Sequence, residues 1–329
     1  VRRVQGGGPP TARTVFDLDD PEFLVAAPRT KEHEVTSYVT VMKGCDERCT
    51  YCIVPTTRGP EVSRHPDLIL KEIELLKQAG VVEVTLLGQN VNSYGKDQPG
   101  FPSFAELLRM VGGMGIPRVR FLTSHPVNFT DDIIEAIAET PAICRYIHLP
   151  VQSGSDRVLR RMAREYRRAH YLERIRKIRE ALPDAVLSTD IIVGFPGETE
   201  EDFQILLDFL EEAELDRVGV FAYSPVEGAE ANRLPDPVPE EVKEERKARL
   251  LEVQARVSLR KNQRFVGKTL EVLVDELPEP GLAVGRTYRD APGVDGVVYV
   301  ETDGTVRVGE RIPVRILRAD TYDLHGVQA

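Results

Sequence analysis

The stretch SYVTVMKGCDERCTYC, residues 37–52, sets both the fold and the chemistry of this chain. It begins with a short apolar segment, Ser37–Val41, which predicts a buried strand. A loop with three cysteines follows at once: Cys45, Cys49 and Cys52, spaced C-x3-C-x2-C. A group of thiols directly after a strand is typical of α/β enzymes, because their chemistry sits at the carboxyl ends of the strands.

Three cysteines this close favour a metal centre over disulfides, because such near neighbours pair poorly and leave one thiol over. Zinc normally takes four ligands in two pairs, whereas a cubane iron–sulfur cluster is held by thiolates on its irons. With three thiolates, one iron keeps an open position for a substrate or cofactor. Three buried structural cysteines are the alternative, which the polar neighbours Asp46, Glu47 and Arg48 argue against. The distant Cys144 precedes an apolar run and is expected to be a packed thiol.

Outward from this stretch, short apolar runs alternate with longer segments of helical period. Six runs are expected to be strands: Ser37–Val41, Val82–Leu87, Arg118–Thr123, Tyr146–Val151, Val186–Val193 and Val218–Tyr223. The segments between them are expected to be helices: Pro66–Ala79, Phe104–Val111, Asp131–Ala138, Arg157–Met162 with Ala169–Ala181, and Glu200–Glu212. Six successive βα units predict parallel strands joined by right-handed crossovers. We therefore expect an α/β fold, a partial (β/α)6 TIM-like barrel open along one side.

The pattern changes near residue 236, where Pro235, Pro237 and Pro239 form a stiff connector. A charged amphipathic helix is expected over Glu240–Arg264. Beyond it, short β-runs and Gly-rich turns predict a small antiparallel β-barrel. Its expected strands are Leu270–Val274, Leu282–Arg286, Gly296–Val300 and Arg311–Leu317. We therefore expect three parts: residues 1–35, a linker or N-terminal remnant; 36–264, the core domain with its connecting helix; and 265–329, the small β-barrel.

The composition, 41% hydrophobic and 29% charged over 329 residues, is that of a soluble globular protein. No window approaches about 20 unbroken apolar residues, so no membrane-spanning helix is expected. The net charge of −10 indicates no overall basic surface for binding nucleic acid, but it permits a local basic patch. The chain opens with Val1, and no apolar segment follows its two arginines as a signal peptide requires. We expect a cytoplasmic fragment of a longer protein.

The cysteine loop resembles that of the radical S-adenosylmethionine (SAM) superfamily, in which an aromatic residue, here Tyr51, precedes the third cysteine. Further segments resemble the methylthiotransferase branch of that superfamily, and the final 65 or so residues are similar to a TRAM domain, an OB-like barrel. The segments are Arg58-Gly59 with Ser63-Arg64, Leu87–Asn90, His148–Ser155 and Asp190–Thr199. The resemblance runs from about residue 36 to the end of the chain.

The resemblance implies a chemistry for the three cysteines. Cys45, Cys49 and Cys52 would hold a [4Fe–4S] cluster whose open iron chelates the amino and carboxylate groups of SAM. One electron from a donor would then cleave SAM to a 5′-deoxyadenosyl radical. Tyr51 would pack near the cluster and the adenine. This chemistry belongs to the cofactor, and the protein positions it and excludes water, so we assign no catalytic side chain.

Four polar residues at strand ends would hold the polar groups of SAM: Gln89, Gln152, Ser153 and Asp190. Each also has a plainer interpretation. Gln152 and Ser153 can cap the next helix, and Asp190 can be a structural hydrogen-bond acceptor.

Methylthiotransferases of this family also carry an N-terminal domain, in which three further cysteines bind a second [4Fe–4S] cluster used in sulfur transfer. No cysteine precedes Cys45 in this sequence. We therefore expect the second cluster only in a full-length protein, and we expect this chain to bind SAM but not to complete methylthiolation alone.

The family divides by substrate. One branch (MiaB type) modifies C2 of N6-modified adenosine 37 of tRNA, and the other (RimO type) modifies the β-carbon of an aspartate of small-subunit ribosomal protein twelve. Early segments such as Thr123–Pro126 resemble the tRNA branch, and later ones such as Ala291–Gly296 resemble the ribosomal branch. The small barrel has eleven acidic and seven basic side chains, a net charge of −4. Because phosphate binding needs positive charge and an acidic surface suits a basic protein, we expect the ribosomal protein, with tRNA as the alternative.

Two observations keep other interpretations open. The segment Arg157–Arg179 carries ten basic side chains and two acidic ones. It is either a patch that faces tRNA or a solvated face of a helix. A non-catalytic RNA- or ribosome-binding module with zinc on the cysteines is a further alternative. The six βα units with polar strand ends argue against that module.

Overall fold

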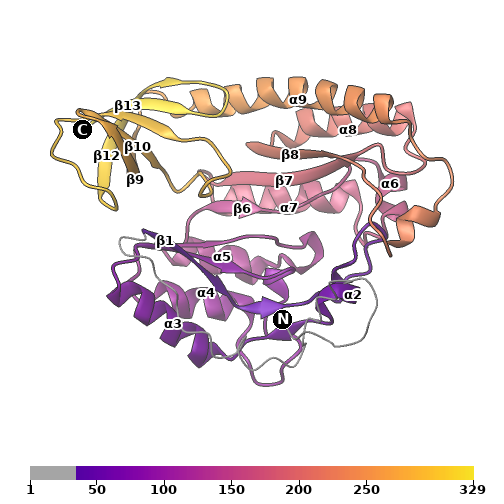
Figure 1. The fold of residues 1–329 in the computed structure, drawn as a ribbon, viewed down its shortest axis with the longest axis horizontal. Coiled ribbons are helices and arrows are strands. Elements are labelled where there is room, and N and C mark those ends of the chain that lie inside the picture. The colour runs from indigo at the N-terminus through magenta and orange to yellow at the C-terminus, as the bar shows by residue number, and fades with distance from the viewer. Residues whose placement is uncertain (1–34) are drawn as a thin grey trace, which may run out of the picture.

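In the computed structural model, the described residues, 35–329, form a curved α/β layer, a long helix and a small β-barrel (Figure 1). The expected linker, residues 1–35, lies outside the described residues except for Val35. The expected α/β fold with six parallel strands and a second, smaller β-barrel is confirmed.

The first half of the strand layer is a parallel sheet in the order β1-β4-β5. Its strands are β1 (Thr36–Thr40), β4 (Glu83–Leu87) and β5 (Arg118–Phe121). The helices that connect and follow them are α3 (Pro66–Gln78), α4 (Phe104–Gly112) and α5 (Asp131–Glu139). A capping box between Ser103 and Glu106 starts α4 where the sequence predicts it.

The second half is a parallel sheet in the order β6-β7-β8. Its strands are β6 (Tyr146–His148), β7 (Val186–Val193) and β8 (Arg217–Ala222). Its helices are α6 (Asp156–Arg161), α7 (Arg168–Ala181) and α8 (Glu200–Ala213). A second capping box, between Thr199 and Asp202, starts α8.

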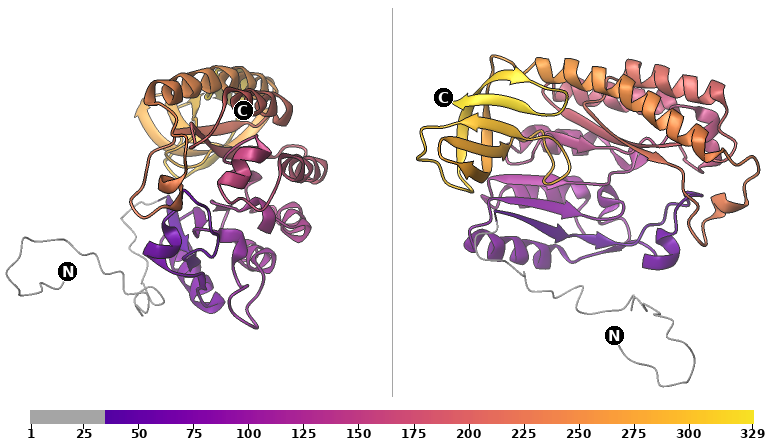
Figure 2. Two further views of the ribbon diagram at one scale, coloured as in Figure 1. Left: turned by 90° about the vertical axis from the view of Figure 1, so that its right-hand side faces the viewer. Right: turned by 45° about the horizontal axis from the view of Figure 1, so that its top comes forward.

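The six strands do not form one continuous ladder. Between β5 and β6 the pairing shrinks to a parallel bridge from Val119 to Ile143 and a hydrogen bond of 3.3 Å from Ser124 N to His148 O. The helices gather along one side of the curved layer (Figure 2). Most of the buried apolar side chains of both halves belong to one core cluster, so the two sheets pack as a single body.

A separate group of short elements frames the cysteine loop. Strand β2 (Met42–Lys43) pairs antiparallel with β3 (Val62–Ser63), and helix α2 (Val54–Arg58) lies between them in the chain. Three single 3-10 turns follow β4, β5 and β8: η1 (Val91–Ser93), η2 (Pro126–Asn128) and η3 (Glu230–Arg233). These short elements carry too few residues to show a period in the sequence.

Helix α9 (Glu240–Gln263) runs along the top of the molecule and packs on β8 and α8 (Figure 1). Of its apolar side chains, Leu250 and Val257 are buried, but Leu251 is exposed. The rest of the buried face is polar: Gln254 Nε2 donates to Leu215 O at 2.8 Å, and Ser258 Oγ donates to Asp216 O at 2.9 Å. The helix is thus held partly by hydrogen bonds to the start of β8.

The C-terminal part is a closed five-stranded barrel in the order β10-β11-β13-β12-β9. Its strands are β9 (Thr269–Glu279), β10 (Leu282–Arg286), β11 (Val298–Glu301), β12 (Arg311–Ala319) and β13 (Leu324–Gln328). All pairs are antiparallel except β11 with β13, which is parallel. The sequence pattern did not predict β13, where Gly326 interrupts the apolar run. That glycine is needed, because a Cβ there would lie 2.5 Å from Arg315 O.

Buried ion pairs join the barrel to the first sheet. Glu83, on β4, is fully buried and accepts from Arg120 at 2.9 Å and from Arg286 of the barrel at 2.6 Å. Arg118 and Arg120 also donate to backbone carbonyls of the barrel segment 286–288. Because these charges have little access to water, their pairing fixes where the barrel sits. Among the described residues, no helix is both long and apolar enough to cross a membrane.

Candidate functional site

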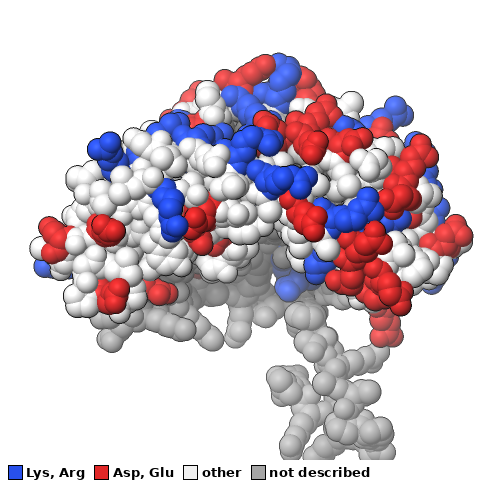
Figure 3. Space-filling view, turned by 90° about the horizontal axis from the view of Figure 1, so that it is seen from above, with Lys and Arg blue, Asp and Glu red and all other residues white. Residues whose placement is uncertain are grey.

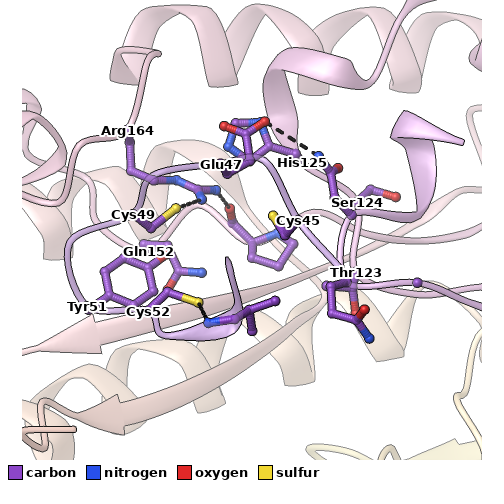
Figure 4. A pocket seen from close by; sticks show the side chains of 15 residues that line it. Cys45, Glu47, Cys49, Tyr51, Cys52, Thr123, Ser124, His125, Gln152 and Arg164 are labelled. Atoms are coloured by element: carbon purple, nitrogen blue, oxygen red, sulfur yellow. Dashed lines mark hydrogen bonds and ion pairs between the residues drawn. The ribbon is translucent and has the colours of Figure 1, made fainter. Parts of the chain in front are cut away.

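The three clustered cysteines line one cavity of about 310 Å³ beyond the carboxyl ends of the first strands (Figure 4). We call it the cysteine cavity. Cys45, Cys49 and Cys52 are half-buried and free of disulfides, while Cys144 is buried elsewhere, as expected of a packed thiol. The other lining residues are Glu47, Tyr51, Val54, Gly88, Gln89, Asn90, Thr123, Ser124, His125, Pro150, Gln152 and Arg164.

The turn before Cys45 is built around a glycine. Gly44 has a φ of +78°, and a Cβ there would lie 1.8 Å from Pro60 O. Its N–H donates to Gln89 Oε1 at 2.7 Å, and Cys45 N donates to Gly59 O at 3.2 Å. Only glycine fits this close approach and this backbone conformation.

Two of the sulfurs accept hydrogen bonds. Arg164 Nη1 donates to Cys49 Sγ at 3.1 Å, and Val54 N donates to Cys52 Sγ at 3.4 Å. Two further hydrogen bonds fix the position of Arg164, which donates to Tyr166 Oη at 2.9 Å and to Pro150 O at 3.2 Å. Donors aimed at sulfur stabilise negative charge on a thiolate.

Burial governs the protonation of these thiols. It raises the pKa of Cys45 to about 12, and it also raises the pKa of Cys52. Both side chains are therefore neutral thiols at pH 7 unless a cation binds them. Coordination to a metal deprotonates a thiol outright, so this donor set suits a positively charged inorganic centre.

One wall of the cysteine cavity presents buried polar atoms without partners. Asn90 Oδ1, Ser124 Oγ and His125 Nδ1 have no hydrogen-bond partner, although His125 Nδ1 lies 3.6 Å from Glu47 Oε1 (Figure 4). Burial, with Arg164 and Lys96 nearby, lowers the pKa of His125 to about 3, so its ring is neutral. Unpartnered buried polar atoms cost free energy.

The residues present fit a cluster and SAM. Among residues 35–329, no three His, Cys, Asp or Glu side chains converge closely enough to ligate a single ion. A cubane cluster requires a different geometry, since each thiolate binds a different iron. Three thiols around one cavity that polar side chains also line meet that requirement and leave room for a polar ligand.

Three of the expected SAM contacts lie in the cysteine cavity: Tyr51, Gln89 and Gln152. The Gln89 amide oxygen already accepts from Gly44, so it also orders the cysteine loop. Gln152 has a φ of +68° and continues the pairing with β7, its N–H donating to Asp190 O at 2.9 Å. Its left-handed backbone turns its side chain away from the strand direction and toward the cavity (Figure 4).

Ser153 and Asp190 are placed differently from the expectation. Ser153 is buried, does not line the cysteine cavity, and its Oγ accepts from the N–H of Ser155, the N-cap of α6. This hydrogen bond agrees with the plainer, structural interpretation. Asp190 lines a second cavity, with its Oδ2 3.3 Å from His148 Nε2. The structure thus places both residues outside the cysteine cavity.

The second cavity, about 600 Å³, lies between the strand layer and the small barrel. Thr123 lines both cavities, so they adjoin at this residue. Its φ of +65° is an outlier for a β-branched side chain, and such strain gathers at binding sites. Its N–H donates to His148 Nδ1 at 3.3 Å. The remaining lining residues are Leu122, Tyr146, His148, Ser188, Asp190, Arg217, Val218, Gly219, Phe221, Ala291, Val294, Asp295, Gly296 and Tyr322.

Several residues of these cavities have no role among the expectations drawn from the sequence. Arg164 was counted only within a run of basic residues, although it is the residue of that run that reaches a cysteine. Thr123, Ser124 and His125 were noted as a motif but not as site residues. Their position directly after β5 is the signal that could have identified them.

Comparisons with known proteins agree with these observations. Residues 39–210 match the family model of the Radical SAM superfamily, and residues 266–328 match that of the TRAM domain. The chain is 74% identical over 279 residues to a tRNA-2-methylthio-N(6)-dimethylallyladenosine synthase of Thermus thermophilus, covering 84% of this chain and 60% of that protein. It is 61% identical over 303 residues to the ribosomal protein uS12 methylthiotransferase RimO of the same organism, covering 89% and 69%. The chain thus spans about 60% of the length of the first of these relatives.

Among solved structures, the radical SAM methyltransferase TsrM from Kitasatospora setae is similar with a TM-score of 0.48 and 18% identity, over 56% of this chain and 35% of that one.

Proposed function

Because the chain belongs to the methylthiotransferase family of the Radical SAM superfamily, we propose that it is a transferase that binds a [4Fe–4S] cluster at Cys45, Cys49 and Cys52 and uses SAM. The observation that carries the proposal is the convergence of three free thiols and several polar side chains on one cavity. An electron donor is a necessary partner of such an enzyme.

The cluster, when bound with SAM, supplies the one-electron cleavage of a carbon–sulfur bond. The residues of the protein would bind the cluster and SAM and orient them. Arg164 donates to the sulfur of Cys49, and Gln89 holds the Gly44 turn in place. Asn90, Ser124 and His125 offer polar atoms to SAM, and Tyr51 and Gln152 line the same space. The enclosing wall limits water near the reacting atoms.

We propose ribosomal protein uS12, modified on an aspartate, as the substrate. Support comes from the net charge of −4 on residues 265–329, which attracts a basic protein and repels phosphate. The segment Arg157–Arg179 does not compensate for it. Five of its ten cations are already paired with carboxylates: Arg157 with Asp202, Arg168 with Glu212, Arg174 and Lys177 with Asp131, and Arg176 with Glu173 and Glu180.

The charge distribution on the face seen from above agrees with this view (Figure 3). There, over α9 and its surroundings, Lys and Arg are interspersed with Asp and Glu, and no broad patch of positive charge covers this face. A surface that grips RNA needs such a patch.

A second candidate substrate is the N6-modified adenosine 37 of tRNA. The observation that favours it is the higher identity to the tRNA-modifying relative, 74% against 61%. The alignment with the tRNA-modifying relative spans 84% of this chain, and the alignment with RimO spans 89%. The higher identity to the tRNA-modifying relative is therefore measured over a shorter part of this chain.

We also propose that residues 36–264 form the core domain, that residues 265–329 form the TRAM domain, and that the protein acts in the cytoplasm. The helix α9 ends at Gln263, and the barrel has its own core cluster, which supports this boundary. A cytoplasmic location follows from the substrates of the relatives and from an oxygen-sensitive cluster.

The first experiment tests the cofactor. The chain is reconstituted anaerobically with iron and sulfide, then given SAM and dithionite. A brown protein that releases 5′-deoxyadenosine is the expected result. A colourless protein that holds one tightly bound zinc and leaves SAM intact would support the non-catalytic binding module instead.

The second experiment tests the substrate. We measure the binding of purified uS12 to the reconstituted chain across a range of salt concentrations. The same measurement is made with tRNA that carries the N6-dimethylallyl group but no methylthio group. We expect uS12 to bind more tightly. Tight tRNA binding with a steep salt dependence, and no binding of uS12, would assign the chain to the tRNA branch.

A further inference from the structure

We propose that the second cavity receives a loop of the substrate protein, and that Asp190 pairs there with a Lys or Arg side chain of that loop. This inference rests on the proposed function and goes beyond it by assigning the binding site. The cavity is formed by both parts of the chain, with His148 and Asp190 from the strand layer and Val294 and Tyr322 from the barrel.

The accessible charge of the second cavity is negative. Its only Lys or Arg among the described residues is Arg217, which is buried. Its Nη2 donates to Asp290 at 3.0 Å and to Tyr322 O at 2.9 Å, and its Nε and Nη1 are buried without a hydrogen-bond partner. Asp190 keeps about a third of its side chain exposed, 35%. Asp295 adds a second carboxylate. A phosphate entering this space meets carboxylates and no accessible cation, whereas a Lys or Arg side chain meets a partner.

The Asp190 carboxylate is held in a fixed position. His148 Nε2 lies 3.3 Å from its Oδ2. On the neighbouring strand stands Gly219, where a Cβ would lie 2.5 Å from Asp190 Oδ1. The absence of a side chain at Gly219 therefore provides the space that the carboxylate occupies. A carboxylate fixed in advance loses little conformational freedom when it binds a partner.

Apolar side chains line the rest of the cavity and remain exposed. Val294 is 79% exposed, Phe221 is 55% exposed and Tyr322 is 44% exposed. They come from the strand layer and from the barrel, and all three belong to the same cavity. Exposed apolar side chains gathered next to a polar anchor are typical of protein-binding surfaces. A peptide loop can cover them while its basic side chain reaches Asp190.

The second cavity adjoins the cysteine cavity. Thr123 is common to both cavities. A residue next to the basic side chain of the loop can therefore extend past Thr123 toward the cysteines. This places the modified residue close in sequence to a Lys or Arg.

The first test is a site-specific crosslink in the reconstituted full chain, with purified uS12 as the probe. The photoreactive substitution Val294→p-benzoylphenylalanine reports on the second cavity. The matched control is Val308→p-benzoylphenylalanine, at an exposed valine that does not line the cavity. We expect a crosslink to uS12 from position 294 and little or none from position 308.

The second test is a charge substitution. We expect Asp190→Asn to weaken uS12 binding by about tenfold at low salt, with a smaller loss at high salt because screening weakens ion pairs. The matched control Asp208→Asn removes the same charge from an exposed position on α8 and should leave the affinity unchanged. Circular dichroism and thermal unfolding verify that each variant is folded.

The outcomes separate this inference from the proposed function. If uS12 binds the wild-type chain but crosslinks equally from both positions, or if Asp190→Asn and Asp208→Asn bind alike, the site is elsewhere and the proposed substrate stands. If tRNA rather than uS12 crosslinks from position 294, the cavity takes RNA and the inference is wrong. If uS12 does not bind the wild-type chain at all, the proposed substrate fails together with the inference.

Discussion

Arg164 Nη1 donates a hydrogen bond of 3.1 Å to Cys49 Sγ, although 115 residues separate the two in the chain. The contact joins the loop after β2 to the segment after α6, which brings the two halves of the strand layer together at the cysteine cavity. Arg164 also lies over the ring of Tyr166, 5.1 Å from its centroid. A buried guanidinium beside a cluster thiolate affects the charge that the cluster can carry.

We predict that Arg164→Leu lowers the midpoint potential of the reconstituted cluster. Removing a positive charge and a hydrogen bond from a cysteine sulfur disfavours the reduced state. A loss of about 1 kcal/mol corresponds to about 40 mV for one electron. The measurement is a redox titration followed by electron paramagnetic resonance. Arg164→Lys, which keeps the charge, should shift the potential less. Equal potentials in all three proteins would show that Arg164 has only a structural role.

We predict that the Ala substitutions of Cys45, Cys49 and Cys52 each prevent stable cluster assembly, because a cubane with two protein thiolates is poorly held. Iron content and visible absorption after reconstitution are the measurements. Cys144→Ala is the matched control. Since Cys144 is buried away from the cysteine cavity, that variant should keep the iron content of the wild type. Iron retention in two of the three loop variants would contradict the assignment.

We predict that Gly44→Ala disrupts the cysteine loop. The substitution adds left-handed strain of about 1–2 kcal/mol and also a clash, because its Cβ would lie 1.8 Å from Pro60 O. Gly80→Ala is the control, since Gly80 has a φ of +91° with no atom near its Cβ. Reconstituted iron content should fall in Gly44→Ala and stay unchanged in Gly80→Ala. A similar loss in both variants would mean that backbone strain alone accounts for the effect.

We predict that Glu83→Gln destabilises the protein by about 3–5 kcal/mol at pH 7, because it leaves the buried Arg120 without its carboxylate partner, whereas Arg286 keeps Asp275. Urea unfolding measures the change. Glu139→Gln removes one partner of the exposed pair with Arg109 and should cost less than about 1 kcal/mol. Equal effects of the two substitutions would refute the account of the interface.

The same carboxylate gives a pH dependence. Burial raises the pKa of Glu83, but Arg120 and Arg286 outweigh it and hold that pKa below the ordinary value of 4.5. A depressed folded-state pKa stabilises the protein fully above the unfolded-state value, and this contribution is lost as pH falls toward the folded-state value. The stability difference between wild type and Glu83→Gln should therefore be largest above about pH 5 and should shrink as the pH falls below 4.5. A difference that stays constant down to acid pH would contradict the prediction.

Much of the fold could be predicted from the sequence, because its signals are local. All six expected strands of the layer form, from β1 to β8, and so does each expected helix, because hydrophobic period and capping residues act within a few positions of the chain. The missed elements are those with weak local signals. Strand β13 contains Gly326, and the β2–β3 pair has only two residues on each side.

By itself, the sequence determined the α/β alternation, the second barrel and the three cysteines as candidate cluster ligands, since each depends on neighbouring residues. Only the tertiary structure decided which distant side chains share a cavity. It brought Arg164 to Cys49, and it placed Asp190 in the second cavity beside His148. The physical reason is that strand ends and loops converge through packing of the whole layer, so their contacts depend on geometry that no short stretch of sequence encodes.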